Sequence, residues 1–255
     1  MKRYGLTART AQKGEQTMLN HKDSHDRFQY LLFDLDGTLT DPKLGITGCV
    51  QYALHKLGIE EPDLDKLEPF IGPPLADSFQ EFYGFGAEKS AEAIVYYRER
   101  FSTVGLFENE IYPSVDEMLA HLKRAGKTLA LASSKPTVFV KKILQHFGIE
   151  PYFDVIVGSE LDGTRARKEE VIEEALRQLR QIAVCDQKEE FLSDKEDNDG
   201  IVMIGDRKFD IQGAKLFNLV SVGVTFGYAL PGELEAAGAD YIVESVAALE
   251  ELLNG

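Results

Sequence analysis

The sequence contains no tryptophan, only two cysteines and no long hydrophobic run. The two cysteines, Cys49 and Cys185, lack the short spacing of a metal site, so we interpret them as reduced thiols of a cytoplasmic protein. No apolar stretch comes near the roughly 18 residues that a membrane-spanning helix needs. These absences argue against a cysteine-based metal centre and against a protein embedded in a membrane.

Positive charge is also scarce, since 28 lysines and arginines stand against 43 aspartates and glutamates, for a formal net charge of −15. A strongly acidic surface repels phosphate backbones and anionic lipids, so we expect neither nucleic acid nor a membrane as partner. The 255 residues, 44% of them hydrophobic, suffice for one large domain or for a core domain with a small accessory one.

Two segments are too polar to bury. Residues 1–27 lack the apolar centre of a secretory signal, and we expect them to form a disordered or extended tail. Residues 187–200 are rich in Asp, Glu and Lys and predict a solvated loop. The wider polar region, residues 181–200, is longer than the connection expected there, and the sequence indicates no function for it.

The rest of the chain is organised around an apolar run, Tyr30–Phe33, that predicts a strand buried on both faces. Segments of helical periodicity separate it from further predicted strands at residues 128–132, 154–158, 201–205, 219–224 and 241–243. Strands that alternate with helices connect through right-handed crossovers. The prediction is an α/β fold, a Rossmann-like parallel sheet with helices on both faces.

The alternation is interrupted after the first strand. Residues 42–111 contain helical spacings and Pro- and Gly-rich turns but no good strand, which predicts a small all-helical cap inserted there. The core domain would then consist of residues 28–41 and 112–255.

Two acids, Asp34 and Asp36, come directly after the first strand. Because strand side chains alternate, both point to the same side, where two like charges repel unless a cation lies between them. A hard, oxygen-seeking ion such as Mg²⁺ is the natural occupant. An acidic turn that merely caps a strand would show the same two residues, so the assignment depends on polar groups further along the chain.

Three further polar groups fall at or near the ends of predicted strands. They are the run Ser133, Ser134 and Lys135, the basic patch of residues 164–168 at the start of a predicted helix, and the pair Asp206 and Asp210. The carboxyl ends of parallel strands share one edge of the sheet, so we expect these groups to converge on Asp34. Two acid pairs, a hydroxyl and a lysine together are suited to handling phosphate on a metal ion.

In these four motifs, and in their order along the chain, the sequence resembles the haloacid dehalogenase (HAD) superfamily of phosphohydrolases. The resemblance rests on Phe33-Asp34-Leu35-Asp36-Gly37-Thr38, Ser133, Lys168 and Gly205-Asp206-x-x-x-Asp210, and it covers the chain from about Tyr30 onward. The cap position is similar to the subfamily that includes phosphoglycolate phosphatases. The segments Phe70-Ile71-Gly72-Pro73-Pro74-Leu75 and Gly205-Asp206-Arg207-Lys208-Phe209-Asp210 resemble members named phosphoglycolate phosphatase or 5′-nucleotidase.

The resemblance implies a Mg²⁺-dependent phosphatase that hydrolyses phosphomonoesters of small metabolites, with phosphoglycolate or a 5′-nucleotide as substrate. It assigns Asp34 as nucleophile and Asp36 as general acid and base. The implied metal ligands are Asp34, Asp36 (through its backbone carbonyl), Asp206 and Asp210. The implied phosphate ligands are Ser133, Lys168 and Gly37, whose missing side chain lets the backbone approach phosphate.

Several residues keep a second interpretation. Ser134 competes with Ser133, Asp210 could be a helix N-terminal acid, and Lys168 could belong to a solvated basic turn with Arg165 and Arg167. Lys135 could contact substrate or water. Candidates for the specificity pocket are Gly72, Pro73 and Phe79, although most aromatic residues of the cap are better interpreted as its core.

Other functions stay open at this point. A phosphosugar mutase of the same superfamily would differ only in where the phosphoryl group goes, and a phospho-acceptor switch would use a similar set of residues. Asp36 favours turnover over a lasting phosphoryl mark, and a dehalogenase would not need it. A non-catalytic binding protein would not need the complete set of acids. The expected partner is a small phosphorylated metabolite, and the expected state is a monomer or a homodimer.

Overall fold

The computed structural model describes residues 27–185 and 198–254. The predicted tail, residues 1–27, therefore lies outside the described residues except for Arg27, as do residues 186–197 of the predicted polar loop.

The core is a six-stranded sheet in which every neighbouring pair of strands runs parallel, as the alternation of elements predicted. The strand order is β5 (Val155–Ser159), β4 (Thr128–Pro136), β1 (Tyr30–Phe33), β6 (Asn198–Gly205), β7 (Leu219–Val224) and β8 (Tyr241–Val243). The central strand β1 has β4 on one side and β6 on the other. Acidic residues that come directly after β1 and β6 therefore lie next to each other at the same edge of the sheet.

Alternation along β1 divides the core into two layers. Leu31 and Phe33 pack into one cluster, which also buries the apolar stripes of α4 (Val115–Arg124), α5 (Thr137–His146) and α9 (Val246–Asn254). Tyr30 and Leu32 pack into the other cluster, beneath α6 (Lys168–Cys185) and α7 (Lys208–Leu216). The predicted arrangement of helices on both faces of the sheet is confirmed. Two short helices, η4 (Glu150–Tyr152) and α8 (Glu233–Ala237), complete the described core.

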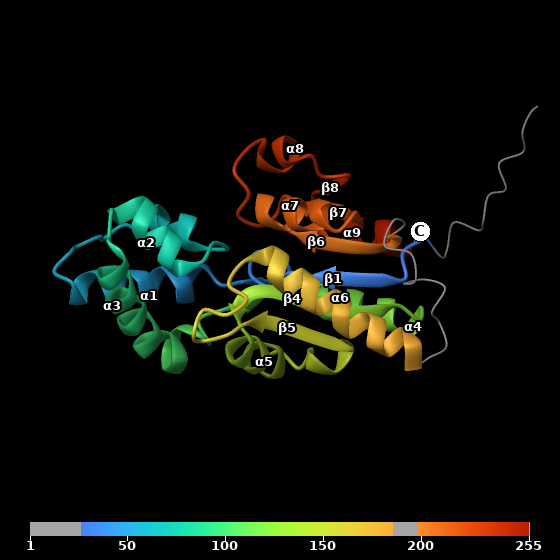
Figure 1. Cartoon of the computed structure of the whole chain (residues 1–255), viewed down its shortest axis with the longest axis horizontal. Coiled ribbons are helices and arrows are strands. Elements are labelled where there is room, and N and C mark those ends of the chain that lie inside the picture. Colours follow the sequence, from blue (N-terminus) through green and yellow to red (C-terminus); the bar gives the residue numbers. More distant parts are fainter. Residues whose placement is uncertain (1–26, 186–197, 255) are drawn as a thin grey trace, which may run out of the picture.

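A helical insertion comes after β1 and forms the left-hand part of the molecule in Figure 1. It contains α1 (Lys43–Lys56), the 3-10 helix η2 (Leu64–Phe70), α2 (Leu75–Tyr83), α3 (Ala87–Arg100) and a π-helical turn η3 (Phe101–Gly105). At its base β2 (Thr40–Asp41) pairs antiparallel with β3 (Glu110–Ile111). The prediction of no strand up to Ile111 was wrong here, because a two-residue strand is too short to show alternation.

Two strand boundaries differ from the prediction by more than one residue. Strand β4 continues to Pro136 with a register shift after Ala132, so Ser133, Ser134 and Lys135 lie on the strand. Strand β6 starts at Asn198, inside the predicted loop of residues 187–200, and α6 includes residues 181–185. Asn198 can be buried because its side-chain amide donates to the carbonyl of Phe217 at 2.8 Å.

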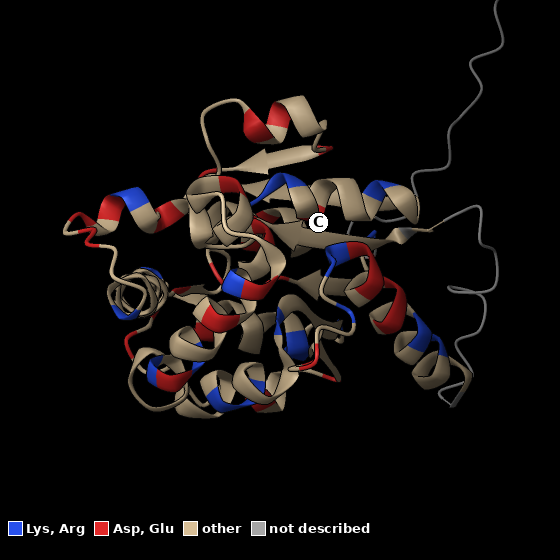
Figure 2. Cartoon of the chain, turned by 60° about the vertical axis from the view of Figure 1, so that its left-hand side comes forward, with Lys and Arg blue, Asp and Glu red and all other residues tan. Residues whose placement is uncertain are grey.

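The described chain contains no helix long and apolar enough to cross a membrane. Acidic and basic side chains are distributed over the helices of both the core and the insertion (Figure 2). Cys49 is buried within the insertion, and burial raises the pKa of its thiol to about 11.

Candidate active site

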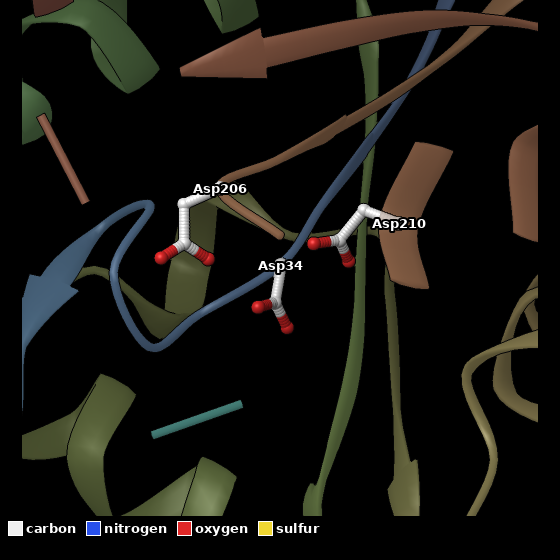
Figure 3. Close-up of side chains that lie close together, drawn as sticks. All are labelled: Asp34, Asp206 and Asp210. Atoms are coloured by element: carbon white, nitrogen blue, oxygen red, sulfur yellow. The ribbon is translucent and has the colours of Figure 1, made fainter. Parts of the chain in front are cut away.

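Three buried carboxylates meet at the carboxyl edge of the sheet. Asp34 comes after β1, Asp206 comes after β6, and Asp210 lies in the first turn of α7; their exposed fractions are 5%, 0% and 1%. One carboxylate oxygen from each lies within 4.8 Å of the others (Figure 3). The pairing of β1 with β6 brings two of them together, since Asp34 N donates to the Ile204 carbonyl at 2.9 Å.

Glycine backbone wraps closely around two of these acids. A Cβ on Gly37, which has a φ of +81°, would overlap the Asp206 carboxylate, and a Cβ on Gly205 would overlap Asp210. A Cβ on Gly227 would overlap both the Gly37 carbonyl and Asp206. The next amide, Tyr228 N, donates to Asp206 Oδ2 at 2.7 Å. The backbone therefore fixes Asp206 from two loops that are far apart in the sequence.

Lys168 supplies a buried positive charge to this cluster. Its Nζ lies 2.7 Å from Asp34 Oδ1, 2.8 Å from Asp210 Oδ1 and 3.0 Å from the Ala132 carbonyl. Burial alone would lower the pKa of Lys168, but the carboxylates of Asp210 and Asp34 raise it by a larger amount. The pKa of Lys168 therefore lies above its ordinary value, and the ammonium stays charged. Its neighbours in the basic stretch are placed differently, since Arg165 pairs with Glu160 and the Arg167 side chain is 76% exposed.

One ammonium does not neutralise three carboxylates. Burial, together with repulsion from Asp210 and Asp34, raises the pKa of Asp206 well above its ordinary value. Burial likewise raises the pKa of Asp210 to about 6, although Lys168 opposes the shift. Asp206 Oδ1 is a buried oxygen without a hydrogen-bond partner. An all-oxygen donor set with an unpartnered buried oxygen fits a hard cation such as Mg²⁺.

The Asp36 carboxylate is directed to a different partner. Lys135 Nζ lies 2.8 Å from both of its oxygens, and the two side chains are 8% and 9% exposed. Burial raises the pKa of Asp36, and Lys135 opposes that shift. The Asp36 side chain is therefore not part of the three-acid cluster, and metal binding through its backbone carbonyl stays a prediction.

The two candidate serines on β4 lie in different surroundings. Ser133 is buried, and its Oγ accepts from Lys135 N at 3.4 Å. Ser134 borders a cavity, and its carbonyl accepts from Ser159 Oγ at 2.7 Å. The assignment of Ser133 as the phosphate ligand stays a prediction.

A cavity of about 170 Å³ lies between the insertion and the core, with Asp36 in its wall. Its lining is largely apolar and includes Ile46, Phe70, Leu75, Ile94, Tyr97, Phe101 and Phe139. Gly72 and Pro73 line it, and their role in substrate specificity stays a prediction. Phe79 does not line it: it is fully buried, stacks on Phe85 and meets Phe70 edge to face. Phe79 is a core residue of the insertion, so its assignment to the pocket was wrong.

Sequence reasoning missed four residues of this region or gave them no role: Lys135, Arg207, Gly227 and Tyr228. Gly227 and Tyr228 come shortly after the end of β7, at the same edge of the sheet, so the strand-end rule could have found them. The ion pair of Lys135 with Asp36 had no sequence signal, because it depends on the irregular end of β4.

Comparison with known proteins agrees with the fold. The model of the haloacid dehalogenase-like hydrolase family matches residues 31–224. A 5′-nucleotidase of Pseudomonas aeruginosa is 42% identical over 238 residues, which cover 91% of this chain and 99% of that protein. The tyrosine-protein kinase PtkA of Mycobacterium tuberculosis is 35% identical over 224 residues, or 88% of this chain and 71% of that protein.

Among solved structures, a predicted phosphatase from Clostridium acetobutylicum superposes with a TM-score of 0.79 and 47% identity, covering 88% of this chain and 97% of that one. Taken together with these matches, the parallel sheet, the helical insertion and the carboxylate cluster define an α/β hydrolytic enzyme. The chain belongs to the haloacid dehalogenase-like hydrolase family. The resemblance that the four motifs indicated, and the enzyme class it implied, are confirmed.

Proposed function

We propose that this protein is a Mg²⁺-dependent phosphatase that hydrolyses small phosphomonoesters through a phosphorylated Asp34. The observation that carries the proposal is the surrounding of Asp34: a buried lysine at 2.7 Å and two further buried acids within 4.8 Å. A carboxylate so placed can be directed at an electrophile while the neighbouring positive charge offsets the negative charge of a phosphate.

The residues that would hold Mg²⁺ are Asp34, Asp206 and Asp210, with the Asp36 backbone carbonyl as a further ligand. When bound, the ion would neutralise negative charge on the phosphoryl oxygens and on the acids. Lys168 would bind a phosphoryl oxygen, and Ser133 another. Gly37 would leave room for the phosphate next to the backbone.

In the first half-reaction the Asp34 carboxylate attacks phosphorus, and the bond between phosphorus and the ester oxygen breaks. Asp36 gives its proton to the departing oxygen, so the leaving group departs as an alcohol. The raised pKa of Asp36 suits this role because burial favours the protonated carboxyl, and Lys135 then stabilises the carboxylate that remains.

In the second half-reaction water attacks the phosphorus of the aspartyl-phosphate. Asp36 accepts a proton from that water, the bond between phosphorus and Asp34 oxygen breaks, and inorganic phosphate leaves. Both acids return to their starting protonation states.

The leaving group would occupy the cavity between the insertion and the core, with residues 42–111 acting as a cap domain that closes over it. Four aromatic side chains line this cavity: Phe70, Tyr97, Phe101 and Phe139. Such walls suit the flat apolar part of a nucleoside better than the small polar glycolate group. A 5′-nucleotide is therefore the substrate class to test first, in line with the name of the Pseudomonas aeruginosa relative.

The test is hydrolysis of 4-nitrophenyl phosphate by Asp34→Asn, and then of a panel of nucleotides and phosphoglycolate with and without Mg²⁺. We expect Asp34→Asn to be inactive and folded. The matched control is Asp77→Asn, which neutralises an exposed acid of the insertion and should retain full activity. An active Asp34→Asn enzyme, or equal rates with and without Mg²⁺, would end the proposal.

A second candidate is transfer of the phosphoryl group from Asp34 to an acceptor hydroxyl in place of water. This candidate is included because one relative, 35% identical to this chain, is named a tyrosine-protein kinase. Product analysis separates the two: a phosphatase releases inorganic phosphate in proportion to the alcohol, whereas a transferase or a sugar-phosphate mutase forms a new ester. A stable phosphorylated protein without turnover would indicate a switch.

A further inference from the structure

One arginine joins the acid loop to the insertion. Arg207 comes directly after Asp206 and is only 8% exposed. Its Nη1 donates to the carbonyl of Ile71 at 2.7 Å, across the boundary between core and insertion. Ile71 begins the turn formed by residues 71–74, in which Gly72, Pro73 and Pro74 line the cavity. We refer to residues 71–74 as the cavity turn.

The cavity turn is shaped to receive this side chain. Gly72 has a φ of +106°, which favours glycine, and a Cβ there would lie 3.2 Å from Arg207 Cγ. A side chain at this position would strain the backbone and crowd the arginine by a few tenths of an ångström. Phe70, the residue before the turn, is anchored in the aromatic core of the insertion against Phe79, Phe82 and Tyr83.

The Arg207 side chain is itself held in place by residues of the core. Arg207 Nε donates to Glu233 Oε1 at 2.8 Å, in an ion pair whose side chains are 10% and 7% exposed. Glu233 also accepts from Lys208 N at 2.9 Å and from Leu230 N at 3.3 Å. The Arg207 backbone amide donates to Asp210 Oδ2 at 3.1 Å. The guanidinium is thus held in place before it reaches the turn, which lowers the entropy cost of that contact.

We propose that Arg207 is a positioning residue that holds the cavity turn against the acid loop and thereby sets how firmly the enzyme binds the leaving group. The inference rests on the proposed function, because it concerns the same site. Arg207 touches neither phosphorus nor the ester oxygen in the proposed mechanism; it acts through residues 71–74. Loss of the Arg207 side chain should therefore weaken the binding of a substrate more, the further the leaving group of that substrate reaches into the cavity.

The test compares Arg207→Met with Lys208→Met, a neighbouring exposed cation whose ammonium lies over the Phe209 ring. Each variant loses one positive charge beside the site, but only the first loses the hydrogen bond to Ile71 and the ion pair with Glu233 that holds the guanidinium in place. We expect Arg207→Met to lower kcat/KM for 4-nitrophenyl phosphate by about tenfold, the effect of one lost charged hydrogen bond. For acetyl phosphate, whose leaving group is much smaller than 4-nitrophenol, kcat/KM should change by less than about twofold on the same reasoning.

Hydrogen exchange provides a readout that does not depend on activity. Amides around residues 71–79 should exchange about tenfold faster in Arg207→Met than in wild type or Lys208→Met, with the sheet unchanged. If Arg207→Met fails to fold, Arg207→Lys takes its place. A lysine keeps the charge but cannot contact Ile71 and Glu233 at the same time. Arg207→Lys should therefore show the same difference between the two substrates, with a smaller loss of kcat/KM.

Equal losses for both substrates, or exchange at residues 71–79 no faster than in Lys208→Met, would overturn the role of Arg207. Those results would leave the proposed function intact as long as Asp34→Asn is inactive on both substrates. An active Asp34→Asn enzyme would instead remove the proposed function, and this inference with it.

Discussion

Lys168 Nζ lies 2.7 Å from Asp34 Oδ1, although 134 positions separate the two residues in the sequence. The contact forms because α6 starts at the edge of the sheet where β1 ends, so the first residue of the helix reaches the first residue after the strand. Lys168 also lies 2.8 Å from Asp210, and it therefore balances two acids, one directly after β1 and one in the first turn of α7.

Replacing Lys168 by methionine should leave Asp34 and Asp210 without their cation. Breaking a buried charged pair in this way typically costs about 3–5 kcal/mol of unfolding free energy. Loss of one charge-stabilising group should also lower kcat by roughly a hundredfold. Denaturant unfolding and steady-state kinetics measure the two effects. The matched control is Arg167→Met, whose side chain is 76% exposed and should be neutral in both assays; similar losses in the control would contradict the account.

The acid cluster also predicts how magnesium and pH act together. Folding raises the pKa of Asp210 from 3.8 to about 6, so the protonated form is stabilised in the metal-free protein. That contribution is complete below about pH 4 and is lost as pH rises through about 6. A metal ion binds carboxylates in their ionised form, so on the proposed assignment the stabilising effect of Mg²⁺ should grow over the same interval.

Thermal unfolding at about pH 5 and about pH 7.5, with chelator or with Mg²⁺, tests this linkage. At the higher pH, free Mg²⁺ at a hundredfold excess over its Kd should add about 2.7 kcal/mol of stability. Asp206→Asn should abolish most of that gain. An equal magnesium effect at both pH values would contradict the assignment of these acids as ligands.

Gly227 should tolerate no side chain, because a Cβ would overlap the Gly37 carbonyl and Asp206. Gly227→Ala should displace the Asp206 carboxylate, and a misplacement of about 1 Å can cost roughly a hundredfold in rate. Gly86→Ala is the matched control, since a Cβ there meets nothing within 4 Å. The affinity for Mg²⁺, measured by metal titration, and kcat should both fall in Gly227→Ala and stay unchanged in Gly86→Ala. Normal Mg²⁺ affinity in Gly227→Ala would show that the loop is free to move.

Phe79→Ala tests whether this residue belongs to the core of the insertion. Removing a fully buried phenylalanine should lower the unfolding free energy by about 3–5 kcal/mol. The relative rates on different phosphate esters should stay unchanged, because Phe79 does not line the cavity. A change in substrate preference without loss of stability would restore its interpretation as a specificity residue.

Much of the fold could be predicted because it depends on local patterns. The apolar run before Asp34 and the helical spacings after it define the parallel sheet, and strand ends at one edge place Asp206 and Asp210 beside Asp34. Ranking Lys168 above Arg165 and Arg167 came from motif order, and the structure places Lys168 on the acids.

The features that the sequence could not predict depend on contacts between distant loops. The ion pair of Lys135 with Asp36 needs the register shift in β4, and the bond from Arg207 to Ile71 needs the insertion docked on the core. Phe79 was misassigned because an aromatic residue beside a Pro-rich turn looks the same whether it faces a cavity or a core. Only packing against Phe70 and Phe85 separates the two.

The most direct test of the central claim is to trap the phosphoryl group on Asp34. In Asp36→Asn the proton acceptor for the hydrolytic water is lost, so 4-nitrophenyl phosphate, whose leaving group needs little protonation, should phosphorylate the enzyme faster than water releases it. Acid quenching and peptide mass spectrometry should then find one phosphoryl group on the peptide that carries Asp34, sensitive to hydroxylamine and absent in Asp34→Asn. A phosphoryl group on any other residue, or continued turnover with none on Asp34, would contradict the account.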